Sequence, residues 1–190
     1  MDVYEAIAAR RSVRQFVREP VDRAVLERVF RSASLAPSAR NEQPWQFYIA
    51  IGDTRIELGR ILSQTTVYLG EYVDELGPSG FDRAVAWFSS LGDAPVLTLI
   101  AAPESVDEMT ATNRMLSVGT ALENLLLAAT AEGLAGCPFT FSFWVRAELA
   151  KKVSLPDGWT VACAVALGWP AAGAESARRA PRSDATIWLD

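Results

Sequence analysis

The 190-residue chain contains no histidine, and only two of its residues are cysteines. Without histidine there can be no Ser-His-Asp or Cys-His triad, and no imidazole acid or base near neutral pH. Two cysteines are too few for a four-thiolate zinc or iron–sulfur site. Cys137 and Cys163 lie in apolar stretches, which is typical of core residues in a reduced, cytoplasmic protein. We expect no catalytic side chain and no metal, so an enzyme of this sequence would borrow its reactive atoms from a cofactor.

Long hydrophobic runs are also missing. The longest, over 94–103, is far shorter than the roughly 20 residues that span a bilayer. Residues 1–11 have acids before bases and no apolar region, unlike a signal peptide. We therefore expect no membrane contact. Half of the residues are hydrophobic, and the length suits a single domain over 1–190.

The net charge of −5 argues against a nucleic-acid partner, because such proteins normally carry a basic face. The charge is unevenly spread: residues 1–60 have a balance of +2, residues 61–175 of −8 and the last fifteen of +1. All basic residues in the two terminal segments are arginines. The planar guanidinium grips phosphate or carboxylate with two parallel hydrogen bonds. Most arginine clusters are nevertheless only solvated surface.

Hydrophobic periodicity predicts alternating helices and strands. Helices are expected at 2–10, from 22 to near 37, and at 54–73, 81–91, 109–132 and 145–153, and strands at 45–51, 95–101, 136–142 and 160–169. The longest helix carries one apolar stripe, made of Met115, Val118, Leu122, Leu125, Leu126 and Ala129. We expect an α+β domain with a central mixed sheet of about four to five strands, flanked by helices.

Three segments are candidates for a ligand site. In the first, Arg10, Arg11, Ser12 and Arg14 could surround one phosphate. The second, 36–45, is stiffened by two prolines and could aim its amides and the Asn41 side chain at a ligand, or could simply connect a helix to a strand. The third holds Arg178, Arg179 and Arg182, which could equally lie in solvent.

Four stretches, in order and at plausible spacing, resemble the FMN-dependent nitroreductase family. They are RRSVRQF (10–16), LAPSARNEQPWQFYIA (35–50), GTALENLLLAATAEGLAGC (119–137) and ALGWP (166–170) followed by RRAP and TIW. The resemblance implies a homodimer with FMN at the subunit interface, and a C-terminal tail that packs across the dimer. Three places depart from the family's pattern: Pro138, the pair Leu116-Ser117, and Ser183-Asp184. The resemblance therefore does not identify the substrate.

The same resemblance implies roles for particular residues. The FMN phosphate would be held by Arg10, Arg11, Ser12 and Arg14, joined by Arg178 and Arg179. The flavin would be lined from the partner chain by Pro37, Ser38 and Asn41. Its isoalloxazine ring would lie beside Pro138, Phe139 and Thr140, and Cys137 would form a wall of the site. The aromatic residues of the weakest-matching region could form a lid over the flavin or could be ordinary core. They are Tyr68, Tyr72, Phe81, Trp87 and Phe88.

The implied activity is electron transfer from NAD(P)H through FMN to a small acceptor such as a nitroaromatic or a quinone, in a ping-pong cycle. Such chemistry belongs to the cofactor and requires no histidine. Two alternatives stay open. The scaffold could serve a flavin-dependent dehydrogenase, oxidase or ene-reductase, or the arginines could belong to a non-catalytic module that binds an anionic partner.

Overall fold

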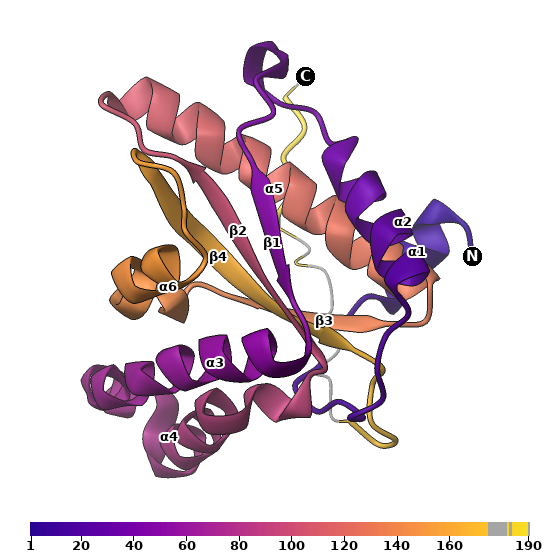
Figure 1. Cartoon of the computed structure of the whole chain (residues 1–190). Helices are drawn as coiled ribbons and strands as arrows, with labels where there is room; N and C mark the ends of the chain where they lie inside the picture. Colours follow the sequence, from indigo (N-terminus) through magenta and orange to yellow (C-terminus); the bar gives the residue numbers. More distant parts are fainter. Residues whose placement is uncertain (175–181, 183, 190) are drawn as a thin grey trace.

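A four-stranded sheet forms the centre of the molecule (Figure 1), in a computed structural model that describes residues 1–174, 182 and 184–189. In spatial order the strands are β1 (Gln46–Ala50), β2 (Val96–Pro103), β4 (Trp159–Gly168) and β3 (Ala135–Phe139). Helices cover both faces of the sheet, so the expected α+β architecture is confirmed.

The expected mixed sheet is wrong in its strand pairing, since all three ladders are antiparallel. The parallel pairing found among the described residues is an isolated bridge between Ser12 and Gly136. The sequence conceals this arrangement because both faces of the sheet are covered by helices. A strand buried on both sides is a continuous apolar run, whichever way its neighbours point. In β2, seven of the eight residues are buried.

The helices lie close to their expected positions. They are α1 (Val3–Ala9), α2 (Arg23–Ser34), α3 (Gly52–Ser63), α4 (Val73–Ser90), α5 (Glu108–Ala131) and α6 (Arg146–Lys152), with 3-10 turns η1 (Ala39–Asn41), η2 (Gln64–Tyr72), η3 (Leu91–Asp93) and η4 (Phe141–Val145). The single helix expected over 54–73 is instead α3 followed by η2. Among the described residues, no helix combines the length and the apolar character that crossing a membrane requires.

The expected break before residue 81 is a kink inside α4. Gly77 adopts φ 66° and ψ 165°, a conformation that glycine tolerates far better than other residues. Pro78 follows directly, where the helical hydrogen bonding is already interrupted, so its missing N–H costs little. The helix resumes after the kink and starts earlier than expected.

Two hydrophobic clusters occupy the two faces of the sheet. Helices α2 and α5 pack over one face, and α3, α4 and α6 with η2 and η4 pack over the other. A smaller group, here called the edge cluster, lies beside β3 and consists of Val13, Phe16, Ala94, Ala135, Cys137 and Ala166. The edge cluster ties the arginine-rich segment near the N-terminus to the sheet.

Helix α5 is only half covered by this chain. Val118, Leu125 and Leu126 of the stripe are buried, but Met115 of the same stripe is 47% exposed. The reason is length: α5 has 24 residues, whereas α2, which packs along it, has 12. The N-terminal half of α5 therefore presents Met115 and Leu116 to the outside.

Candidate functional site

The arginine segment, residues 10–16, is an extended strip held along the sheet edge. Helix α1 ends at Ala9, and the backbone of the next residue, Arg10, is extended (φ −54°, ψ 131°). Val13 N–H donates to the carbonyl of Gly136 at 3.3 Å, and Phe16 N–H donates to that of Gly92 at 2.9 Å. These bonds place Val13 and Phe16 in the edge cluster and leave Arg14 exposed.

The predicted phosphate residues Arg10, Arg11, Ser12 and Arg14 are thus brought together on one strip, but their charges are balanced differently. Arg10 Nε lies 3.2 Å from Glu123 Oε1 of α5. Arg11 Nη1 donates to the carbonyls of Ala8 (2.7 Å) and Arg10 (2.6 Å). Among the described residues Arg11 and Arg14 form no ion pair, so the strip offers two uncompensated positive charges to an anion.

The second segment is the rigid loop that its prolines predict. Arg40, Asn41 and Gln43 all have positive φ, between 49° and 55°. Gln43 N–H donates to Ser38 Oγ at 2.9 Å, and Gln43 Nε2 donates to Asn41 Oδ1 at 3.0 Å. These hydrogen bonds within the loop hold the side chains of Ser38 and Asn41, two of its three predicted flavin residues.

The loop docks on the exposed half of α5. The Thr120 hydroxyl donates to the carbonyl of Pro37 at 2.9 Å, and Ala39 N–H donates to Ser117 Oγ at 3.2 Å. Sequence reasoning missed Arg114, whose guanidinium Nη2 lies 2.7 Å from Glu42 Oε1 and holds the end of the loop. The pairing of residues this far apart leaves no local signal in the sequence.

The third group, at the end of β3, lies against aromatic rings. Pro138 is tolerated because β3 is an edge strand that needs hydrogen bonds on one side only. Phe139 packs edge-on against Trp87, with ring centroids 5.2 Å apart, and Thr140 follows at the surface. The predicted trio therefore sits beside the arginine strip, at the same edge of the sheet.

Of the aromatic residues weighed as lid or core, Phe88 is buried and the other four are half-buried. Phe88 is buried against Phe141 with ring centroids 5.0 Å apart, and Tyr68 stacks on Trp144 at 4.6 Å. Tyr72 meets Phe141 edge-on at 5.4 Å. Phe88 is thus a core residue, with Phe81 and Trp87 packed against the same cluster, whereas a lid role for the half-buried rings stays a prediction.

Both cysteines are buried and free of disulfides. Burial raises the pKa of the Cys163 thiol to about 12. Burial also raises the pKa of Cys137, although the positive charge of Arg14 opposes the shift. The predicted core role of Cys163 is confirmed. The role of Cys137 as a flavin wall stays a prediction.

The C-terminal candidates Arg178 and Arg179 lie outside the described residues. Arg182 forms an ion pair with Asp184 at 2.7 Å. Beyond it Ile187, Trp188 and Leu189 are each at least 79% exposed, so these apolar side chains are not packed against the described residues.

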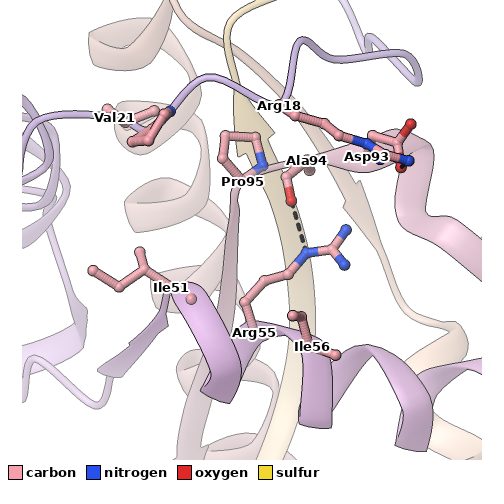
Figure 2. A pocket seen from close by; sticks show the side chains of 10 residues that line it. Arg18, Val21, Ile51, Arg55, Ile56, Asp93, Ala94 and Pro95 are labelled. Carbon is pink, nitrogen blue, oxygen red and sulfur yellow. Dashed lines mark hydrogen bonds and ion pairs between the residues drawn. The ribbon is translucent and has the colours of Figure 1, made fainter.

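A separate cavity of about 610 Å³ opens between α3 and the start of β2 (Figure 2). Arg55 crosses it and donates to the carbonyls of Ala94 (2.7 Å) and Ser90 (2.8 Å), while Arg18 pairs with Asp93 at its rim. Burial lowers the pKa of Arg55 from its usual value. None of the predicted site residues lines this cavity, and its arginine serves as a clamp on the backbone before β2. Among the described residues no group of acidic or cysteine side chains is placed to hold a metal ion.

The comparison with known families decides the assignment, since residues 7–169 match the nitroreductase family. This chain belongs to that family. The assignment confirms the family expected from the motifs, and with it an oxidoreductase enzyme.

Several enzymes are similar in sequence. A 4-nitrobenzoate reductase of Pseudomonas putida is 26% identical, with 88% of this chain and 85% of the relative covered. A 5,6-dimethylbenzimidazole synthase of Rhodospirillum rubrum is 29% identical, with 85% and 78% covered. The relatives of this nitroreductase-family chain thus include both reductases and a synthase.

Solved structures share the fold. The FMN- and NADPH-dependent nitroreductase NfnB from Sphigopyxis sp. strain HMH superimposes with a TM-score of 0.81 at 22% identity, covering all of both chains. A BluB-like flavoprotein from Clostridium difficile 630 gives a TM-score of 0.80 at 20% identity, again over both full chains. The nitroreductase-like fold expected from the sequence is therefore confirmed.

Proposed function

We propose that this chain is an FMN-dependent oxidoreductase that transfers electrons from NAD(P)H to a small organic acceptor, such as a nitroaromatic or a quinone. The observation that carries the proposal is the arginine strip, where the uncompensated guanidinium groups of Arg11 and Arg14 lie beside the end of β3. The family assignment and the FMN- and NADPH-dependent enzyme with the same fold support it.

The residues present fit a bound FMN. A phosphate carries a charge of about −1.5 to −2, which two guanidinium groups can balance through charge-assisted hydrogen bonds. Arg10 and Ser12 would complete the phosphate site, and Arg178 and Arg179 would join them from the tail. Pro138, Phe139 and Thr140 would border the isoalloxazine, with the aromatic core behind Phe139 excluding water from that side.

When bound, FMN supplies the hydride and electron chemistry. The side chains of this protein bind and orient the reactants, and none has to act as an acid or base. NAD(P)H would enter first and its oxidised form would leave before the acceptor takes the same place, which gives ping-pong kinetics. The chain would act in the cytoplasm, as its unpaired cysteines suggest.

We also propose that the active form is a homodimer. The exposed half of α5 forms a shallow apolar hollow around Met115, Leu116 and Gly119. The rigid loop is anchored on this same half, so a partner docked here would bring its own Ser38 and Asn41 toward the flavin. The exposed end at Ile187–Leu189 would find cover on the partner.

The deciding experiment is spectroscopic and kinetic. Purified protein should be yellow with a flavin spectrum, and NADPH or NADH should bleach it. Steady-state rates with a nitroaromatic or a quinone should give parallel double-reciprocal lines, as ping-pong kinetics requires. A colourless protein that does not bind added FMN, and whose affinity for anionic partners falls steeply with salt, would instead support the non-catalytic module.

A second candidate is a flavin-dependent dehydrogenase or oxidase that desaturates its substrate with oxygen as acceptor. The observation that favours it is the similarity to a synthase at 29% identity, beside the reductases. A yellow protein whose flavin is not reduced by either nicotinamide nucleotide would favour this candidate over the reductase. An ene-reductase would be recognised by turnover of an activated alkene with NAD(P)H.

A further inference from the structure

Trp87 stands where the arginine strip, α4 and β3 meet. Its indole Nε1 donates to the carbonyl of Arg14 at 3.1 Å, across 73 residues of sequence. Its ring packs edge-on against Phe139, with an interplanar angle of 86°. One side chain thus contacts the residue proposed to hold the FMN phosphate and a residue proposed to border the isoalloxazine.

The surroundings keep Trp87 itself in place. Trp87 and Phe139 both pack against the cluster over α3 and α4 and against the edge cluster. Phe88, the next residue of α4, meets the Trp87 ring edge-on at 4.9 Å. The indole is half-buried, and these contacts hold its ring in place.

The backbone of Arg14 is also confined from a second side. Turn η3 receives the N–H of Phe16 at the carbonyl of Gly92. The backbone of η3 approaches that of Arg14 so closely that a Cβ on Gly92 would lie 1.9 Å from the Arg14 carbonyl oxygen. The strip is thus clamped between the indole of Trp87 and the backbone of η3.

We infer that Trp87 is a positioning residue for the cofactor, acting through Arg14; this inference rests on the proposed function. The Arg14 guanidinium is exposed and forms no ion pair among the described residues, so its direction depends on its own backbone. Ordering a loose arginine on binding costs conformational entropy, and preorganisation removes that cost. The indole N–H supplies the preorganisation, which acts on the phosphate end of the ligand.

Trp87→Phe tests the inference because it removes the N–H donor and keeps an aromatic ring against Phe139. The dissociation constants of FMN and of riboflavin, which lacks the phosphate, are measured by calorimetry on apoprotein. We expect FMN to bind about five- to tenfold more weakly to the variant and riboflavin to bind within about twofold of wild type. In an Arg14→Ala background, Trp87→Phe should cause no further loss of FMN affinity.

Trp144→Phe is the matched control, since Trp144 stacks on Tyr68 and its indole N–H bonds to none of the described residues. It should leave both dissociation constants unchanged. Unaltered FMN affinity in Trp87→Phe would overturn the inference, and so would equal losses for FMN and riboflavin, which indicate a general packing role. The proposed function fails in a different way, namely when wild-type apoprotein binds FMN no better than the Arg14→Ala protein does.

Discussion

Arg11 and Arg14 differ from Arg10, their neighbour on the same strip, and from Arg18 and Arg28 in how their charge is balanced. Arg10, Arg18 and Arg28 each face a carboxylate, whereas Arg11 and Arg14 form no ion pair among the described residues. Arginines whose charge is not balanced by a carboxylate are suited to bind an external anion, whereas exposed arginines in ion pairs contribute little beyond the pair itself. This distinction cannot be read from the sequence, where all five look alike.

Arg14→Ala should lower FMN affinity about 10- to 100-fold, because a hydrogen bond to a charged group is worth about 1.5–3 kcal/mol. Calorimetric titration of apoprotein with FMN measures the effect. Arg31→Ala, on the exposed side of α2, is the control and should bind like wild type. Equal affinities for the two variants would contradict the phosphate assignment.

Cys163 makes the stability of the fold depend on pH in the alkaline range. Its folded pKa of about 12 lies above the usual value of 9, so the unfolded chain loses its thiol proton first as pH rises. The contribution of this thiol to stability is complete below pH 9 and is lost between pH 9 and 12. The slope cannot exceed about 1.4 kcal/mol per pH unit.

Cys163→Ala should therefore be less stable at pH 7 by about 1–2 kcal/mol, because a buried sulfur is removed. Between pH 9 and 10.5 its free energy of unfolding should fall less steeply than that of wild type. Urea titrations over this range measure both slopes. Parallel curves would mean that the thiol titrates normally in the folded protein.

At the scale of elements, turn η3 is the strained piece that fixes the site. Leu91, Gly92 and Asp93 all have positive φ, between 54° and 63°. Only glycine occupies such a conformation without penalty. Gly92 also has no room for a side chain, because an added Cβ would collide with the carbonyl oxygen of Arg14.

Gly92→Ala should destabilise the protein by about 2–4 kcal/mol, from backbone strain together with displacement of the arginine strip. It should also weaken FMN binding, because Arg14 moves with its carbonyl. Urea unfolding measures the first effect and calorimetry the second. Gly70→Ala is the control, as nothing lies within 4 Å of its added Cβ, and a similar midpoint for both variants would refute the close approach.

Local patterns predicted the elements well and their pairing poorly. Asp2 and Glu5 form the capping box that starts α1, and an apolar run of strand length marks β2, so both are legible over a few residues. The break at Gly77 and Pro78 is also local and was predicted, whereas the strand directions depend on distant packing and were wrong. The site shows the same division: the arginine strip was predicted, but the donor from Trp87 depends on a contact 73 residues away.

At the scale of the whole molecule, two apolar surfaces stay exposed in the part of the chain that the structure describes. One is the N-terminal half of α5, with Leu116 67% exposed, and the other is the tail end around Trp188, 84% exposed. Exposed apolar surface is typical of protein–protein interfaces, and these two surfaces are where we propose that the partner docks. Because the rigid loop is anchored beside the first surface, assembly and cofactor binding should be coupled.

Leu116→Glu should give monomers that retain little FMN, since it places a charge in the proposed interface. Light scattering after size-exclusion chromatography measures the mass, and absorbance measures the flavin content. Val67→Glu is the control, because it also replaces an exposed apolar side chain by a carboxylate. Val67 is 76% exposed and lies on η2, over the opposite face of the sheet. The Val67→Glu protein should stay dimeric. A Leu116→Glu protein that remains dimeric and yellow would place the interface elsewhere.

The position of Trp87 has an optical consequence. With FMN bound as we propose, the Trp87 indole would lie against residues at both ends of the ligand, and transfer of its excitation energy to the flavin would quench its emission. The chain has six tryptophans, and the signal of this one can be isolated by comparing wild type with Trp87→Phe. The protein would then report its own cofactor occupancy as light, in real time and without a label.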